Sequence, residues 1–172
     1  ISQPVAVNFI AKLAPEGSEA RAVIRRQGNV IGRLVASLGP LAGSGGDWTS
    51  RLAAAPLSGG IRYDGNADTL FSLAGQTGQS ITGPFSLAAD FSCTVADPCL
   101  NGVVRGRNLT YENLAYGTQL TKVDLAGRFT GNQLDLTSLT GQAGNGTISA
   151  SGRISLSAAA GYPMDLTARL NQ

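Results

Sequence analysis

The sequence predicts an all-β fold, namely a long, curved, mainly antiparallel sheet folded into a trough with an apolar interior and one or two short helices. Apolar and polar residues alternate with a period of two in many segments, which places them on opposite faces of strands. Glycine supplies 23 of the 172 residues, and glycine in a helix interior costs about 1 kcal/mol relative to alanine, so a helix-rich fold is disfavoured. The segments are joined by short turn signals, whereas parallel neighbours would need crossovers of about a dozen residues.

The alternation predicts roughly ten strands within a single domain spanning residues 1–172. In residues 147–158, Ile148 and Ile154 point to one side and Arg153 to the other. The remaining clear strands cover residues 5–13, 57–63, 85–95, 123–129 and 164–170.

Residues 18–38 fit two interpretations. Ser18 could cap a helix that ends at Gly28. The β-branched side chains of this region favour two strands instead, and we predict strands. These side chains are Val23, Ile24, Val30, Ile31 and Val35.

The strand at 102–111 departs from the alternation, because Arg105 and Arg107 share a phase with Leu109 and Tyr111. An inserted residue would restore the phase, so we predict a β-bulge.

Turn signals suited to hairpins separate several strands. They are Gly28-Asn29, Asp64-Gly65, Gly131-Asn132 and Asn145-Gly146. Two short helices are also expected: Asp47 could cap one that runs to Pro56, and Asn66 could cap one that runs to Gly75.

The two cysteines, Cys93 and Cys99, flank the turn-forming sequence TVADP. If this turn closes a hairpin, the thiols could form a disulfide in an oxidising compartment. The alternative is a pair of reduced, small apolar strand residues, and the spacing matches no zinc motif.

Composition excludes several functions. The chain has no histidine, which removes Ser-His-Asp and Cys-His catalysis and histidine zinc sites. The net charge of +2 is too small to indicate a nucleic-acid partner.

No apolar run approaches the roughly 20 residues of a membrane helix. No nucleophile and base pair is visible, so we do not expect an enzyme, and we expect no cofactor.

Ten strands with one apolar face and little helix to cover them leave two possibilities. The sheet could close on itself as a sandwich or barrel. It could instead form a trough of roughly 48 Å whose exposed apolar area would need a ligand. A lining of small aliphatic residues with few aromatics suits flexible acyl chains.

Four segments have a characteristic order: TVADPCLNG at 94–102, NLTYENLAYGTQL at 108–120, the run from GRFTGNQLDL to AGNGTISASGRISLS, and YPMDL at 162–166. Together, over about residues 56–170, they resemble the C-terminal conserved region of the TamB family, the inner-membrane subunit of the translocation and assembly module. The resemblance implies a segment of a periplasmic, rod-like protein of Gram-negative bacteria with a taco-shaped sheet. It further implies phospholipid acyl chains as ligands and a TamA-like outer-membrane barrel as a partner of the whole protein, through parts expected to lie outside this chain.

The family has no catalytic residues, so the expected functional positions are the inward apolar ones of the lipid groove. Alternation assigns these as Phe9, Ile61, Phe85, Leu87, Phe91, Val123, Leu125, Phe129, Leu134, Leu136, Ile148, Ile154, Leu156, Met164 and Leu166.

Two other sets of residues have simpler interpretations. Arg21, Arg25 and Arg26 could meet lipid phosphates at a groove edge, although a solvated strand face is the simpler reading. Asp64 and Asp68 lie in turn-like sequence without the spacing of a calcium loop, so no metal site is expected.

Two other functions stay open at this point. One is a structural or adhesive module with a closed sandwich or solenoid core. The other is a segment that binds unfolded outer-membrane proteins by pairing with their strands at a sheet edge.

Overall fold

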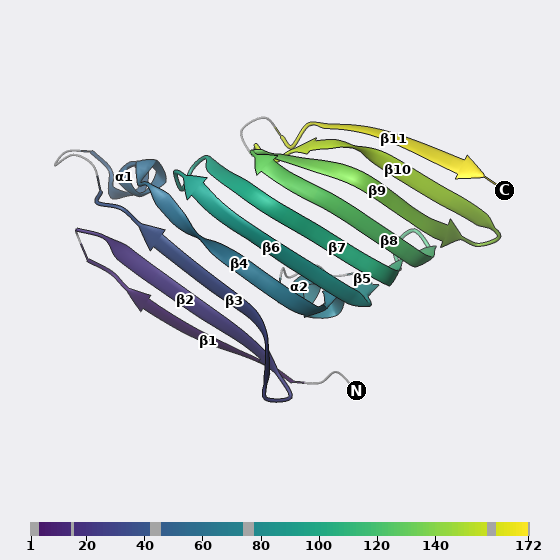
Figure 1. The fold of residues 1–172 in the computed structure, drawn as a ribbon, viewed down its shortest axis with the longest axis horizontal. Helices are drawn as coiled ribbons and strands as arrows, with labels where there is room; N and C mark the ends of the chain where they lie inside the picture. The colour runs from purple at the N-terminus through teal and green to yellow at the C-terminus, as the bar shows by residue number, and fades with distance from the viewer. Residues whose placement is uncertain (1–3, 15, 42–45, 74–77, 158–160, 172) are drawn as a thin grey trace.

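The computed structural model describes residues 4–14, 16–41, 46–73, 78–157 and 161–171, which contain eleven strands and two short helices (Figure 1). The elements are β1 (Val5–Lys12), β2 (Ser18–Arg26), β3 (Asn29–Leu38), α1 (Trp48–Ala54), β4 (Leu57–Asn66), α2 (Ala67–Leu73), β5 (Gln79–Thr82), β6 (Pro84–Cys93), β7 (Pro98–Asn113), β8 (Thr118–Gly131), β9 (Gln133–Ala143), β10 (Gly146–Ser155) and β11 (Met164–Asn171).

All strands belong to one antiparallel sheet, in the order β1-β2-β3-β4-β6-β7-β8-β9-β10-β11, with β5 paired to β7. Apart from β5, each strand therefore pairs with its neighbours in the chain. The sheet is not closed, so the predicted fold class is confirmed and a closed sandwich is not formed.

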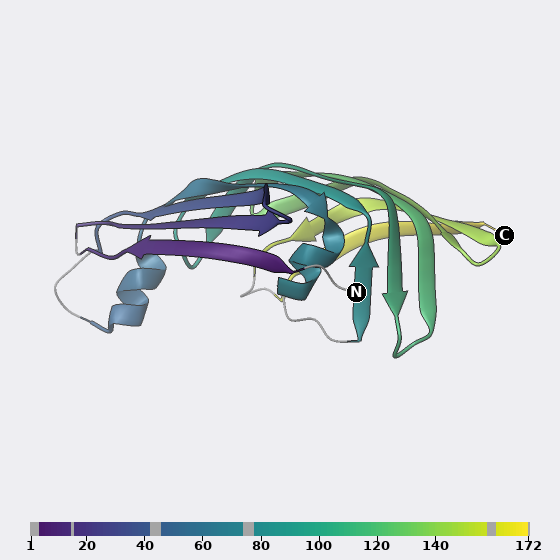
Figure 2. The same ribbon diagram turned by 90° about the horizontal axis from the view of Figure 1, so that it is seen from below.

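The sheet is arched, and both helices and β5 lie on its hollow side (Figure 2). Phe85 and Leu139 of the sheet pack beside Ala67 of α2 in the same cluster. The face that carries these residues is therefore the concave one.

The region that fitted both helix and strand forms two strands, β2 and β3, as predicted. They are joined by Gln27 and Gly28, whose φ angles of 53° and 82° are those of a type I′ hairpin turn.

The expected turn at Asp64-Gly65 is wrong, because both residues lie inside β4 and Gly65 pairs with Phe85. Glycine is needed there for space, since a Cβ would lie 2.8 Å from the Tyr63 hydroxyl.

The predicted bulge in β7 is confirmed. The register between β7 and β8 shifts between Gly106 and Leu109, and Asn108 has a φ of 46°. The backbone N–H of Asn108 donates to Asp124 Oδ1 at 2.8 Å. As a result Leu109 is buried while Arg105 and Arg107 stay exposed.

Both expected helices form. The Asn66 side chain caps α2 by accepting a hydrogen bond from the N–H of Asp68 at 3.2 Å. At α1, Asp47 occupies the cap position without a side-chain bond to the helix backbone. The expected end of the second helix at Gly75 lies outside the described residues. No helix in the described part of the chain is both long and apolar enough to cross a bilayer.

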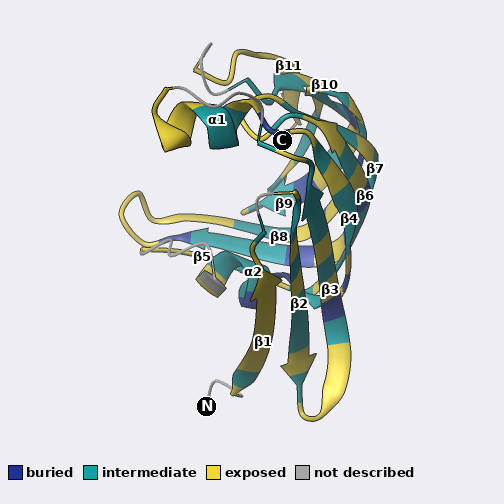
Figure 3. Cartoon of the chain, turned by 90° about the vertical axis from the view of Figure 1, so that its left-hand side faces the viewer, coloured by how far each residue is buried: buried dark blue, intermediate teal, exposed yellow. Residues whose placement is uncertain are grey.

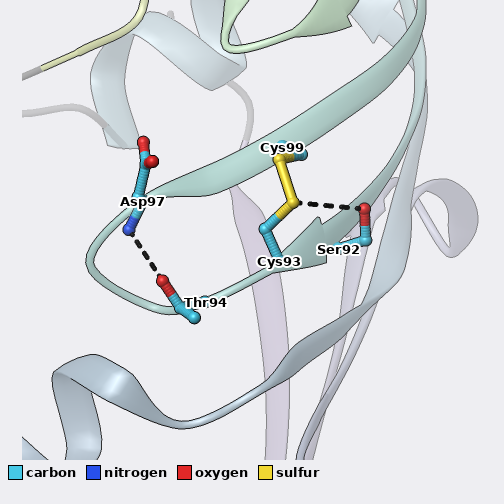
Figure 4. The surroundings of a disulfide bond; sticks show 5 residues. All are labelled: Ser92, Cys93, Thr94, Asp97 and Cys99. Atoms are coloured by element: carbon cyan, nitrogen blue, oxygen red, sulfur yellow. Dashed lines mark hydrogen bonds between the residues drawn. A yellow bond between two sulfur atoms is a disulfide. The ribbon is translucent and has the colours of Figure 1, made fainter.

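Cys93 and Cys99 form a disulfide across the β6–β7 hairpin, with Cα atoms 5.5 Å apart (Figure 4). Within the turn that they flank, the N–H of Asp97 donates to Thr94 Oγ1 at 3.2 Å. This turn also supports α1, because the N–H groups of Val95 and Ala96 donate to the carbonyls of Ala55 and Ala53.

Candidate functional site

The concave face carries a continuous apolar row that crosses ten strands. Its members are directly opposite one another in successive strand pairs, so they lie side by side on one face. Nine steps between strands span roughly 43 Å. This row, called row A, consists of Phe9, Ala22, Leu34, Ile61, Ala89, Gly102, Phe129, Leu134, Ile154 and Met164.

A second row crosses the same ten strands two residues away along each strand. Its only polar atom in a side chain is the hydroxyl of Tyr63, and neither row contains a charged residue. This row, called row B, consists of Val7, Ile24, Gly32, Tyr63, Leu87, Val104, Gly127, Leu136, Gly152 and Leu166.

The convex face between these rows has the opposite character. The residues next to row A in each strand point to this convex face. On four neighbouring strands they alternate in charge and lie opposite one another, in the order Arg128, Asp135, Arg153 and Asp165. Arg153 Nε lies 3.6 Å from Asp135 Oδ1. The sheet therefore separates a charged outer surface from an apolar inner one.

Fifteen residues are predicted from the sequence to line the apolar face, and nine of them lie in rows A and B. Five more, which are Phe85, Phe91, Val123, Leu125 and Ile148, lie on the same face in neighbouring positions. Leu156 lies one residue beyond the end of β10.

Several residues of rows A and B were not among those predicted, notably Ile24, Leu34 and Val104. Ile24 lies in the stretch that also fitted a helix, and Leu34 lies in the strand that follows it. In β7, the two arginines obscure the alternation, and Val104 is identified only by its position opposite Leu87.

The apolar face is largely uncovered. Phe9 is 63% exposed and Met164 is 64% exposed, and Figure 3 shows β1 exposed along nearly its whole length. The total accessible surface is 10944 Å², whereas a folded monomer of this mass typically exposes about 7900 Å². The excess of roughly 3000 Å² reflects a sheet that has an apolar face but no second layer to cover most of it.

One part of the concave face is covered, where α2 and β5 pack on the sheet. Here the buried residues Ala67, Leu109 and Val123 form a core cluster. Beside it lies an apolar pocket of about 190 Å³, lined by Ala67, Leu70, Phe71, Ile81 and Phe85.

Arg26, at the end of β2, follows Ile24 of row B on the concave side and contacts α2. Its Nη1 lies 3.1 Å from Asp68 Oδ1 and 3.2 Å from Thr69 Oγ1. Arg21 lies on a solvated strand face, as the simpler interpretation expected, and its side chain is 3.7 Å from that of Glu19.

Tyr63 connects this polar network to the apolar floor. Its hydroxyl donates to the Asn66 carbonyl at 2.5 Å, and its ring lies near that of Phe85. Burial raises the pKa of Tyr63 above the ordinary tyrosine value, and the charge of Asp68 acts in the same direction.

Comparison of the chain with protein-family models, curated proteins and solved structures found no match. A long apolar surface without charged groups can hold aliphatic chains by burial, and it provides few polar groups to orient a rigid polar substrate.

Proposed function

We propose that this chain is a segment of a TamB-like periplasmic protein, and that its concave trough binds phospholipid acyl chains and conducts them between the inner and outer membranes. In the whole protein this conduit would support outer-membrane protein assembly together with a TamA-like barrel. The observation that carries the proposal is the pair of uncharged rows that cross all ten strands of the main sheet. The resemblance of residues 56–170 to the TamB family supports the same function.

The free energy gained by burying an acyl chain is large enough for lipid binding. Burial of each methylene contributes about 0.8 kcal/mol, so a 16-carbon acyl chain gains roughly 12 kcal/mol before its ordering costs. Because this contribution is non-directional, a chain could occupy different positions along the trough with similar free energy. Such a surface favours transport over retention at one position.

Within the described residues, β1 and β11 each pair with one strand only, which favours a second candidate, the binding of unfolded outer-membrane strands. β1 has no proline between Val5 and Lys12, and seven of its eight residues are exposed. Such an edge can accept a further strand by backbone hydrogen bonding. This function would use the edge of the sheet, whereas lipid transport would use its concave face.

Native mass spectrometry of the chain purified without detergent, followed by lipid extraction, tests the proposal. We expect near-stoichiometric phospholipid. Ile154→Arg places a charge in row A and should reduce lipid occupancy at least about tenfold, because an unpaired charge in an apolar site is unfavourable. Ser151→Arg is the matched control, since Ser151 is an exposed residue of the same strand on the opposite face.

Circular dichroism and the urea midpoint separate lost binding from lost folding. A chain that carries no lipid and takes up none of a labelled phospholipid would overturn the proposal. Capture of an outer-membrane strand peptide by that lipid-free chain would instead favour the edge-binding function. Unfolding of the Ile154→Arg variant alone would indicate that the face is a packed core.

A further inference from the structure

The β7–β8 hairpin extends beyond the rest of the sheet. β7 has 16 residues and β8 has 14, yet β6 pairs with β7 only as far as Gly106, and β9 pairs with β8 only from Thr121. Beyond these points the two strands pair with each other, and β5 pairs with β7. Figure 2 shows this hairpin reaching away from the arch on its hollow side.

The turn at the end of this hairpin, residues 113–118, is here called the hairpin tip. It contains no charged residue. Leu114 is 81% exposed and Tyr116 is 84% exposed, which places them among the most exposed large apolar side chains of the molecule. Two such side chains in one turn form a small, protruding apolar surface.

The hairpin tip is held in a fixed conformation. Asn113 is buried, and its Oδ1 accepts hydrogen bonds from the N–H groups of Ala115 at 3.0 Å and Tyr116 at 3.3 Å. The N–H of Leu114 donates to the Gly78 carbonyl at 3.0 Å. Because the backbone is already ordered, little conformational entropy is lost when the tip binds a partner.

We propose that the hairpin tip inserts Leu114 and Tyr116 into the interfacial region of a phospholipid bilayer. A specific protein partner typically needs about 800 Å² of surface on each side, and a leucine with one aromatic side chain supplies only a fraction of that area. A bilayer needs no matching shape. It accepts an aliphatic side chain in its acyl region, and it accepts tyrosine at the headgroup level, where the ring is buried and the hydroxyl stays hydrated.

This docking is independent of lipid transport, because it requires no acyl chain in the trough. The proposed membrane contact lies at the end of the strands where β7 turns into β8. α1, which carries the single tryptophan of the chain, Trp48, lies at the opposite end of the strands (Figure 1).

Two proteins with one tryptophan each test the proposal. The first is the native chain, which reports from Trp48. The second is the double variant W48F/Y116W, which reports from the hairpin tip. Each is mixed with vesicles of zwitterionic phosphatidylcholine that contain brominated phosphatidylcholine. We expect strong quenching at position 116 and little at Trp48.

A second test compares a variant of the hairpin tip with a variant at the opposite end of the strands. L114N/Y116S should lower the vesicle partition coefficient at least about tenfold, which is the effect of losing two buried apolar side chains. L13N is the control, because Leu13 is 82% exposed and follows β1 at the opposite end of the strands. All variants should keep the urea midpoint of the native chain, since these side chains are exposed.

Quenching of Trp48 equal to that at position 116 would overturn the proposal, as would an equal loss of partition in L13N. Binding restricted to anionic vesicles and abolished by salt would also overturn it, because that result would assign membrane binding to the arginines.

Discussion

Tyr63 is the residue at which the apolar floor of the trough meets a polar network. It belongs to row B, and its hydroxyl donates to the carbonyl of Asn66, the residue that caps α2. The side chain is only 3% exposed, and burial raises its pKa. The neutral phenol is therefore the form that the folded protein accommodates.

This raised pKa predicts a loss of stability at alkaline pH. Below about pH 10 the phenol is neutral in both the folded and the unfolded chain, so its stabilising contribution is fully present. As the pH rises above about 10, the unfolded chain ionises Tyr63 first, and the free energy of unfolding falls. Urea denaturation at pH 8 and at pH 10.5 measures the difference.

Tyr63→Phe is the matched variant. At pH 8 it should lose about 1 kcal/mol, since the hydrogen bond to Asn66 is removed. Above pH 10 its stability should decline less than that of the native chain. An equal decline in both proteins would mean that the pH dependence arises from other tyrosines or from lysines.

At the level of elements, the disulfide fixes the turn between β6 and β7 on which α1 rests. The two cysteines are six residues apart, and closing a loop of this size stabilises a fold by about 2 kcal/mol in the chain-entropy description. Cys93→Ala/Cys99→Ala should therefore lower the free energy of unfolding by about that amount, while the far-ultraviolet circular dichroism is unchanged. A variant as stable as the native chain would show that the turn is held without the cross-link.

The strands themselves could be predicted from the sequence, because a sheet with one apolar face imposes a strict alternation. The bulge in β7 was predicted for the same reason, since Arg105 and Arg107 could not share a face with Leu109. Other features depend on contacts between distant residues. The short strand β5 has four residues and is defined by its pairing with β7, and Gly65 is a strand residue because it pairs with Phe85 of β6.

The candidate site was predictable to a similar extent. Alternation identifies which residues of a strand share a face, and most of the residues predicted to be inward do lie on one face of the sheet. It does not determine the register between strands, which brings Phe9 and Met164 into one row across the sheet. The cover formed by α2, and its ion pair between Asp68 and Arg26, could not be read from the local sequence.

At the scale of the whole molecule, the order of the strands has a consequence for cooperativity. Apart from the β5–β7 pairing, each strand of the sheet contacts its chain neighbours, so stability resembles that of a repeat protein, in which adjacent units interact and distant ones do not. Strands at the two edges have one partner each, whereas β7 has partners on both sides and the core cluster beside it. Amide hydrogen exchange should therefore be fastest in β1 and β11 and slowest in β7 and β8.

Such a gradient would let the outer strands open and close while the centre stays folded. Equal protection across all strands would show instead that the sheet unfolds as a single unit. With local opening, the length of the apolar surface across the strands is not constant, because each edge strand that detaches removes one residue from row A and one from row B.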